Sequence, residues 1–369
     1  MHYNQLVLSM RNERRIALVI VFLTLFMSGL GFGSYLLQVQ NKETLIISTT
    51  TSLYDTGLLD VLKSNYELTH TNVLLAFISA GTGIAITYAM NGDADAILVH
   101  SPAQERLFME QGYGVNRKIF AYNFFTIVGP SSDPAGIHNM SAIQALSKIY
   151  NYGHAHNTSL WASRDDRSGT NAKEIALWNQ TGYEYEELGN EAWFISTGSG
   201  MGSTLQLADE LNLYTLSDIS TFLKFSKDGL IELNSLVASG ETLINVYSAI
   251  AVNGTRVANT IFNLTMDFIQ WIVGNEAQNI IENYGQEEYD QSLFNPAAGI
   301  IQSKSPIETY NWINQSAFFE FGNVFYECPP SWQQGNFGLY LLMNGVTNFD
   351  VPDYVTQYSA RAKRLETCT

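Results

Sequence analysis

Residues 160–179 read LWASRDDRSGTNAKEIALWN, and this stretch decides the fold. The apolar run Leu160–Ala162 predicts a short buried strand, and Ala172–Asn179 has the periodicity of an amphipathic helix. Between them, Ser163–Thr170 supplies hydroxyls, a glycine and two arginines. A polar loop of this kind follows the carboxyl end of a strand, which is where open α/β sheets bind ligands.

Three other stretches of the chain have the same make-up. Their strand, loop and helix are 45–47, 48–52 and 57–68, then 73–78, 79–83 and 84–90, then 193–195, 196–202 and 203–212. One such loop is usually only a helix cap, but four with the same hydroxyl-rich and glycine-rich composition favour a binding site. We therefore expect an α/β protein with largely parallel strands and two lobes, each contributing two loops to one cleft.

Two β-rich runs separate the pairs of loops and predict the domain organisation. Tyr122–Pro130 and Asn245–Asn253 would cross between the lobes, make the first lobe discontinuous and form a hinge, as in clamshell binding proteins. The expected parts are a stub and membrane segment at 1–42, lobe 1 at 43–125 and 246–300, lobe 2 at 126–245, and a C-terminal extension at 301–369.

The chemistry that these loops fit is recognition of a fully ionised tetrahedral oxyanion. Many neutral donors converge from hydroxyls and from the free N–H groups of helix starts. Arg164 and Arg167 are the only basic residues in the four loops. A guanidinium matches an oxyanion, but Asp165 and Asp166 could hold either arginine in a local ion pair. Arg164, the first residue out of the strand, is the better candidate to face the ligand.

Composition and motifs argue against several classes of function. The 369 residues carry 19 Lys and Arg against 35 Asp and Glu, a net charge of −16, which argues against a nucleic-acid partner. The chain has no nucleophile elbow, Walker loop or His-Glu-x-x-His motif, and Gly198–Ser203 lacks the glycine spacing of a dinucleotide-binding loop. We therefore expect neither an enzyme nor a cofactor. His154 and His156 lie in a predicted loop without nearby cysteines, which favours solvent exposure over metal ligation.

The ends of the chain predict export and one disulfide. Residues 16–37 carry no charge and follow the basic cluster Arg11–Arg15, which predicts a membrane anchor with the body outside the cell. Small residues near Gly33 leave a cleaved secretory signal as the alternative. Cys328 and Cys368 of an exported chain predict a disulfide. Six glycosylation sequons are close to the roughly four or five expected by chance and leave glycosylation open.

Several motifs, in order along the chain, resemble those of the tungstate-binding proteins of ABC importers. They are Thr49–Ser52, Ser79–Gly83, Gly92–Asp95, Glu110–Arg117, Asp133–Ile137, Arg164–Thr170, Ser196–Gly202 and Tyr214–Leu216. The resemblance runs from about Glu43 to about Pro296. It implies a type II periplasmic-binding-protein fold that traps tungstate, and less readily molybdate, between two lobes and delivers it to a membrane permease.

The resemblance also implies a set of ligand-binding residues. The oxyanion contacts would fall on Thr50, Thr51, Ser52, Ser79, Thr82, Arg164, Ser168, Gly169 and Thr170, with Thr197 and Gly198 added from the fourth loop. These are the loops that the residue composition had already singled out.

This chain departs from the family pattern at two places. The family has glycine where this chain has Asp165, and commonly Asp or Asn where it has Arg167, so tungstate preference is less secure than oxyanion binding. Family members usually end near Pro296, whereas residues 301–369 continue with an aromatic-rich segment. That segment suggests a packed subdomain or a surface for self-assembly or another protein. The alternative function is therefore an interaction or assembly protein that reuses the clamshell scaffold.

Overall fold

The computed structural model describes residues 42–238, 240–335, 337 and 339. The chain divides into two units, residues 1–44 with 67–74, and residues 45–66 with 75–369. In the first unit, the N–H of Glu43 donates to the carbonyl of Asn72 at 2.9 Å. The second unit holds the loops and most of the sheet described below.

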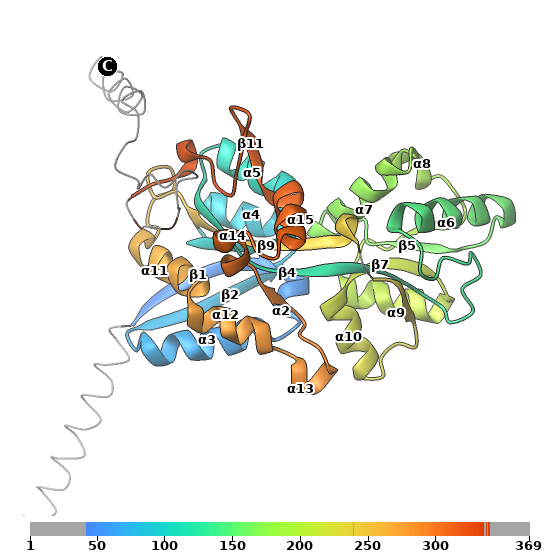
Figure 1. The fold of residues 1–369 in the computed structure, drawn as a ribbon, viewed down its shortest axis with the longest axis horizontal. Helices are drawn as coiled ribbons and strands as arrows, with labels where there is room; N and C mark the ends of the chain where they lie inside the picture. Colours follow the sequence, from blue (N-terminus) through green and yellow to red (C-terminus); the bar gives the residue numbers. More distant parts are fainter. Residues whose placement is uncertain (1–41, 239, 336, 338, 340–369) are drawn as a thin grey trace, which may run out of the picture. The chain divides into compact units, whose positions relative to one another are not determined.

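The strands form a sheet in the order β2-β1-β3-β9-β4-β7-β5-β6, with β10 and β8 also paired to β4 (Figure 1). They are β1 (Glu43–Thr50), β2 (Val73–Ala80), β3 (Ala96–Val99), β4 (Gly114–Gly129), β5 (Trp161–Ser163), β6 (Phe194–Ser196), β7 (Tyr214–Asp218), β8 (Asn234–Val237), β9 (Ile244–Val252) and β10 (Asn295–Pro296).

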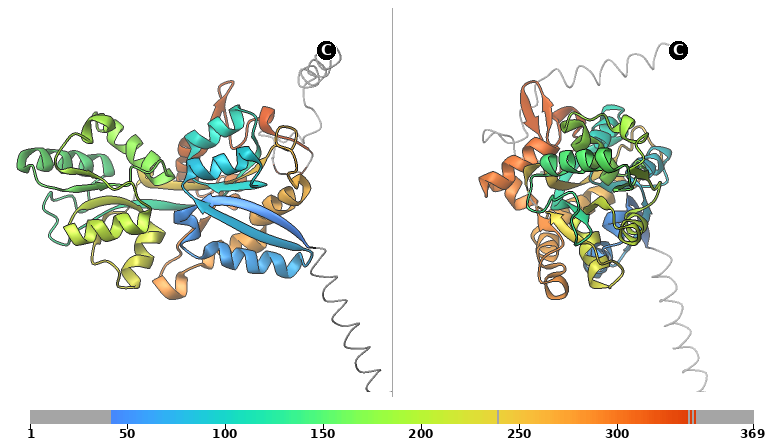
Figure 2. Two further views of the ribbon diagram at one scale, coloured as in Figure 1. Left: turned by 180° about the vertical axis from the view of Figure 1, so that it is seen from behind. Right: turned by 90° about the vertical axis from the view of Figure 1, so that its right-hand side faces the viewer.

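The sheet is mixed, which corrects the expectation of largely parallel strands. β1 pairs with β3, and β5 with β6 and β7, in parallel. β4 and β9 instead run antiparallel to each other and to their other neighbours. The reason lies in β4, which pairs with β9 as far as Phe124 and with β7 from Phe125 onward. The two predicted β-rich runs are therefore neighbouring strands through the middle of the sheet (Figure 2).

Helices follow the strands and bury apolar residues against them. They are α2 (Thr51–Tyr54), α3 (Leu58–Thr69), α4 (Thr82–Asn91), α5 (Pro102–Glu110), α6 (Ala142–His156), α7 (Gly169–Gln180), α8 (Tyr185–Leu188), α9 (Met201–Leu211), α10 (Ile219–Lys227), α11 (Phe262–Ile272), α12 (Asn275–Asn283) and α13 (Gln286–Tyr289). One core cluster contains Trp161, Trp178 and Trp193, all at most 1% exposed. Another gathers Val99, Phe108 and neighbouring apolar residues on β3, α5 and β9.

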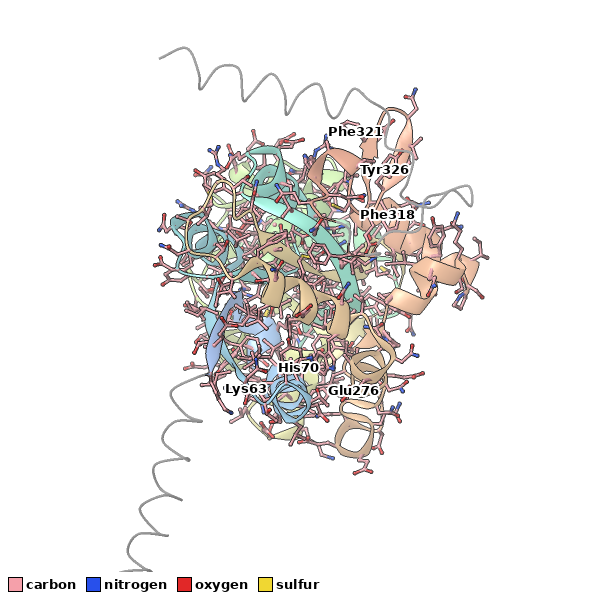
Figure 3. All side chains as sticks on the ribbon, turned by 90° about the vertical axis from the view of Figure 1, so that its left-hand side faces the viewer. Lys63, His70, Glu276, Phe318, Phe321 and Tyr326 are labelled. Atoms are coloured by element: carbon pink, nitrogen blue, oxygen red, sulfur yellow. The ribbon has the colours of Figure 1, made fainter. Side chains whose placement is uncertain are left out.

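The C-terminal segment packs onto β4 and β9. It comprises α14 (Ala298–Ser303), α15 (Ile307–Ala317), β11 (Phe319–Phe321), β12 (Val324–Tyr326) and a 3₁₀ turn at Pro330–Trp332. Ile313 and Ala317 of α15 join a buried cluster with Ile244 and Val246 of β9. On the β11–β12 hairpin, Phe321 is half exposed (Figure 3).

The carboxylate of Glu327 ties this segment to β4. It accepts from Lys118 Nζ at 2.5 Å and from the backbone N–H of Ile119 at 2.6 Å. The Lys118 and Glu327 side chains are about one-tenth exposed, so this ion pair is largely removed from water. Removal of either Lys118 or Glu327 would therefore destabilise the protein, because the remaining charge would stay buried without its partner.

Some predictions fall outside the described residues. These are the membrane segment at 16–37 with its alternative cleavage near Gly33, and Cys368 of the predicted disulfide. Cys328 itself is buried. Within the part of the chain that the structure describes, no helix is both long and apolar enough to cross a bilayer.

Candidate functional site

The loop after β1 carries three of the predicted site residues. Thr50 caps α2, because its Oγ1 accepts from the backbone N–H of Leu53 at 3.3 Å. Thr50 Oγ1 also lies 3.4 Å from Ser52 Oγ, and both side chains are 2% exposed. Thr51 between them is half-buried. Among the described residues, its hydroxyl makes no hydrogen bond.

The loop after β2 carries a buried hydroxyl with no partner. Thr82 is fully buried, and its Oγ1 has no hydrogen bond to any described residue. It is the first residue of α4, whose N-cap Gly81 supplies no side-chain acceptor, so the first N–H groups of this helix also lack a capping side chain. Leaving a buried hydroxyl unpaired costs roughly 1–3 kcal/mol. Ser79, at the end of β2, is exposed.

The loop after β5 buries the predicted arginine. Arg164 is 2% exposed, and its Nε donates to Asp166 Oδ2 at 3.1 Å, while Nη2 donates to the same oxygen. Its Nη1 donates to Thr170 Oγ1 at 3.3 Å. Three of the five guanidinium N–H groups are used in these bonds, so two remain for a ligand. Ser168 caps α7 by accepting from the N–H of Asn171 at 3.1 Å.

The two departures from the family pattern both adopt left-handed backbone conformations. Asp165 has φ of 46° and Arg167 has φ of 61°. Both are exposed, and the N–H of Arg167 donates to Asn171 Oδ1 at 3.2 Å. A glycine at position 165 would adopt this conformation without a steric penalty. The structure thus separates the two arginines, with Arg164 buried and ion-paired and Arg167 in solvent.

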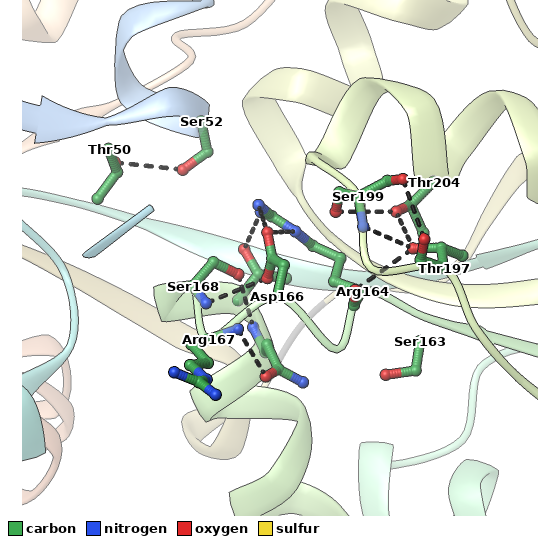
Figure 4. Close-up of polar contacts among 12 residues, drawn as sticks. Thr50, Ser52, Ser163, Arg164, Asp166, Arg167, Ser168, Thr197, Ser199 and Thr204 are labelled. Carbon is green, nitrogen blue, oxygen red and sulfur yellow. Dashed lines mark hydrogen bonds and ion pairs between the residues drawn. The ribbon is translucent and has the colours of Figure 1, made fainter. Parts of the chain in front are cut away.

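The fourth loop supports the third. Thr197 Oγ1 lies 2.9 Å from Thr204 Oγ1 and donates to the carbonyl of Arg164 at 3.4 Å (Figure 4). Its N–H donates to the carbonyl of Ser163 at 2.9 Å. Gly198 is exposed with φ of 60°. Thr197 therefore holds the backbone of the arginine loop, and Gly198 faces open space.

Glycines bring the loops from different strands together. A Cβ placed on Gly81 would lie 3.8 Å from the carbonyl oxygen of Asp166, and one on Gly83 would lie 3.9 Å from that of Arg167. A Cβ on Gly169 would lie only 2.8 Å from the His100 ring. The loop after β2 and the loop after β5 thus lie against each other, and Gly169 allows His100 to approach α7.

His100 is a site residue that sequence reasoning missed. It follows β3 directly and is 4% exposed. Its Nε2 lies 3.2 Å from Ser52 Oγ, and its Nδ1 lies 2.8 Å from Asn245 Oδ1. Burial lowers the pKa of His100 to about 4, with a smaller contribution from the charge of Arg164, although the hydrogen bond with Asn245 opposes the shift. Its position at the carboxyl end of a buried strand was the signal that could have identified it.

A cavity of about 220 Å³ lies beside these loops. Its lining includes His100, Phe125, Gly169, Lys173, Asn245 and Ser316. Lys173 Nζ donates to the carbonyl of Ile244 at 3.3 Å, and burial lowers the pKa of this amine to about 8.

A buried carboxyl group stands behind the arginine loop. Glu174 of α7 accepts from Trp161 Nε1 at 2.7 Å and from Ser163 Oγ at 2.9 Å. Burial raises the pKa of Glu174 to about 7, although these hydrogen bonds oppose the shift. Because Ser163 precedes Arg164, the network fixes the point at which the arginine leaves the sheet.

The histidines considered for a metal lie on α6, so the loop prediction is wrong. His156 Nδ1 lies 2.8 Å from the carbonyl of Tyr152 one turn earlier, and His154 stacks on Tyr150. The helix ends at His156, and Asn157, in a left-handed conformation (φ 50°), forms its C-cap. The described residues contain no group of three or more His, Cys, Asp or Glu side chains that could hold a metal ion.

Comparison with known proteins identifies relatives over most of the sheet. A family model described as the PBP superfamily domain matches residues 38–276. The chain is 36% identical to the tungstate-binding protein TupA of Peptoclostridium acidaminophilum over 264 residues, which cover 71% of this chain and 88% of that protein.

Two solved structures are similar to this chain. One is the tungstate-binding protein TupA from Desulfovibrio alaskensis G20, with 37% identity, 69% of this chain and 98% of that chain covered, and a TM-score of 0.58. The other is the tungstate ABC transporter structure from Geobacter sulfurreducens, with 37% identity, coverage of 66% and 99%, and a TM-score of 0.59. The chain therefore belongs to the PBP superfamily and, within it, to the family of the tungstate-binding proteins.

Proposed function

We propose that the protein is an extracytoplasmic receptor that captures a tetrahedral oxyanion, tungstate or molybdate, for import by an ABC permease. The observation that carries this proposal is Thr82 Oγ1, a fully buried hydroxyl without a partner among the described residues. A buried hydroxyl is normally hydrogen-bonded, so an unpaired one in a loop that lies against the loop of a buried arginine suits a ligand that accepts hydrogen bonds. The similar proteins are named for tungstate or its transporter, which supports the same ligand.

The main proposed donors come from three loops. They are Thr51 after β1, Ser79 and Thr82 after β2, and Arg164, Ser168, Gly169 and Thr170 after β5, with Thr50, Ser52, Thr197 and Gly198 at the margins. The ion pair with Asp166 offsets the charge of Arg164, so neutral donors supply much of the recognition. Such donors in a site shielded from water are worth more than in bulk solvent, because the local dielectric is low.

Closure of two lobes would bury the anion. We propose lobe 1 at 43–125 and 246–300 and lobe 2 at 126–245, with β4 and β9 as the hinge. The change of β4's partner between Phe124 and Phe125 supports this boundary. Tungstate and sulfate share shape and charge, so the size of the closed site would select between them. We further propose that residues 16–37 anchor the body outside the cell, where it would meet the permease.

Thr82 gives the sharpest test, because its variant should change stability and binding in opposite directions. Replacing Thr82 with Val removes the unpaired hydroxyl at nearly constant volume, so the free energy of unfolding of the ligand-free protein should rise by about 1 kcal/mol. Affinity for tungstate should fall by roughly 10- to 100-fold, since one hydrogen bond to a charged group is lost. Urea unfolding and isothermal titration calorimetry measure the two effects.

Thr82→Ser is the matched control, because it keeps the hydroxyl and should keep most of the affinity. The wild-type protein is titrated in parallel with tungstate, molybdate, sulfate and phosphate. Absence of binding to all four would refute the receptor function. Arg164→Ala tests the charged donor, and an unchanged affinity in that variant would remove Arg164 from the site.

A further inference from the structure

A chain of buried hydrogen bonds with a single direction ends at the proposed site. It begins at the backbone carbonyl of Leu293, which can only accept, and which accepts from Ser220 Oγ at 2.7 Å. Ser220 has then used its hydrogen, so its oxygen accepts from Asn123 Nδ2 at 2.8 Å. Asn123 Oδ1 in turn accepts from Asn245 Nδ2 at 2.9 Å. These amide orientations leave Asn245 Oδ1 facing His100 Nδ1 at 2.8 Å.

The direction of the chain determines the tautomer of His100. An amide oxygen only accepts, so His100 Nδ1 carries the hydrogen. Burial and the nearby charge of Arg164 both keep the ring neutral, and Lys173, which lines the same cavity as His100, is also a cation. In a neutral ring protonated at Nδ1, Nε2 is an acceptor. The hydroxyl of Ser52, 3.2 Å away, must therefore donate to His100.

The same logic accounts for the hydroxyl next to Ser52. Thr50 Oγ1 accepts from the N–H of Leu53, and its hydrogen can be donated to Ser52 Oγ, 3.4 Å away (Figure 4). The hydroxyl hydrogens of Thr50 and Ser52 are then both used inside the protein. Thr51 and Thr82, which make no side-chain hydrogen bond among the described residues, keep theirs.

We propose that His100 is a positioning residue, which directs the hydroxyls of Thr50 and Ser52 away from the anion and leaves Thr51 as the hydroxyl donor of the loop after β1, together with Ser79 and Thr82 of the loop after β2. The inference rests on the proposed function and names which groups carry it. His100 also packs against Gly169 and lies 4.9 Å from the ring of Tyr247. It therefore connects the loop after β1 to α7 and, through Asn245 and Asn123, to the crossover strands β9 and β4.

The tautomer can be tested without any ligand. Nitrogen-15 NMR of the histidine-labelled protein, with the resonances of His100 assigned from the spectrum of His100→Gln, should show a protonated Nδ1 and an unprotonated Nε2 from pH 5.5 to 8. Protonation at Nε2, or titration of this ring within that range, would overturn the proposal. Because the measurement needs no anion, it separates this inference from a failure of the proposed function.

The distinction between hydroxyls that bind the anion and hydroxyls that bond within the protein is tested by calorimetry with tungstate. Ser52→Ala should weaken binding by roughly threefold, because one neutral hydrogen bond that orders the loop is lost, whereas Thr82→Val should weaken it by more than tenfold. An equal loss in the two variants would overturn the proposal.

The positioning role of His100 is tested by a pair of variants at that residue. His100→Leu should weaken binding by roughly tenfold, because the loop loses its acceptor and Asn245 its donor. His100→Gln, whose amide oxygen can reach the place of Nε2, should recover most of that loss. Equal affinities in these two variants would contradict a positioning role. The comparison of Ser52→Ala with Thr82→Val and the NMR measurement keep the proposal testable if His100→Leu does not fold.

Discussion

Asp165 is held in a strained conformation that glycine would relieve. Its φ of 46° lies in the left-handed region, which costs an L-residue roughly 1–2 kcal/mol. Asp is near the low end of that range, because its short side chain tolerates the region. Replacing Asp165 with glycine relieves this strain, but it also costs roughly 0.4–1 kcal/mol, because glycine increases the entropy of the unfolded chain. Asp165→Gly should therefore raise the free energy of unfolding by up to about 0.6 kcal/mol, and Tm by up to about 1 °C.

The side chain of Asp165 adds nothing that this substitution would lose. It is exposed and makes no hydrogen bond to another described residue. Removing its negative charge beside the oxyanion loop should also strengthen tungstate binding, most clearly at low salt.

Two controls separate conformation from charge. Asp165→Ala removes the same charge but keeps a Cβ, so it should not gain stability. Asp133 also has positive φ, at 40°, yet its carboxylate accepts from the N–H groups of Ile137 and His138 and from Tyr214 Oη. Asp133→Gly should therefore lose stability. The measurement is urea unfolding of the ligand-free proteins at pH 7. If Asp165→Gly is no more stable than Asp165→Ala, the backbone explanation is wrong.

Other predictions concern buried groups. Burial lowers the pKa of His100 from 6.5 to about 4, so the neutral ring makes its full contribution to the free energy of unfolding above pH 6.5. As the pH falls from 6.5 to 4, the free energy of unfolding should decrease by about 3 kcal/mol. In urea unfolding, His100→Gln should abolish this decrease. Burial raises the pKa of Glu174 from 4.5 to about 7, so the contribution of this carboxyl group to the free energy of unfolding is complete below pH 4.5 and declines by about 3 kcal/mol as the pH rises to 7. Glu174→Gln should remove that decline. An unchanged pH profile in this variant would argue against Glu174 as its cause. The Cβ added in Gly169→Ala would lie 2.8 Å from the imidazole of His100, so this variant should lose about 1–3 kcal/mol of stability and bind the anion more weakly. Gly198 faces open space, so Gly198→Ala should lose about 1–2 kcal/mol through its backbone conformation without displacing the His100 ring. Glu327→Ala should destabilise the protein by about 3–5 kcal/mol, because its lysine partner stays buried, and Glu327→Gln should cost less; equal values would show that the charge is unimportant.

The strand-to-helix junctions were predictable because each combines a short apolar run with a polar loop. Helix starts were less accurate. α4 begins at Thr82, α7 at Gly169 and α9 at Met201, two or three residues before the predicted starts. Residues that resemble loop in composition therefore lie in the first helical turn, where side-chain or backbone capping outweighs the low helix propensity of glycine.

The site residues that the sequence missed act through distant partners. His100 is connected to Ser52 and Asn245, which are 48 and 145 positions away in the chain. No local pattern predicts such pairs, because tertiary packing brings them together. By contrast, the sequence already allowed for a local ion pair of Arg164, because Asp166 is only two residues away. The ligand contacts remain predictions that the experiments above address.

The place of β9 between β3 and β4 determines when the sheet can be completed. Val99 pairs with Ser248, which is 149 positions later in the chain. Closing a loop of that length costs roughly 4 kcal/mol of chain entropy. At translation rates of about 5–20 residues per second, the edge of β3 waits roughly 7–30 s for its neighbour to be synthesised. Strands β5 to β8 are all synthesised before β9. The part of the sheet that contains β1, β2 and β3 is therefore begun first and completed last. A ribosome paused before residue 244 would hold a chain with an open strand edge, the state most exposed to aggregation and to chaperone binding.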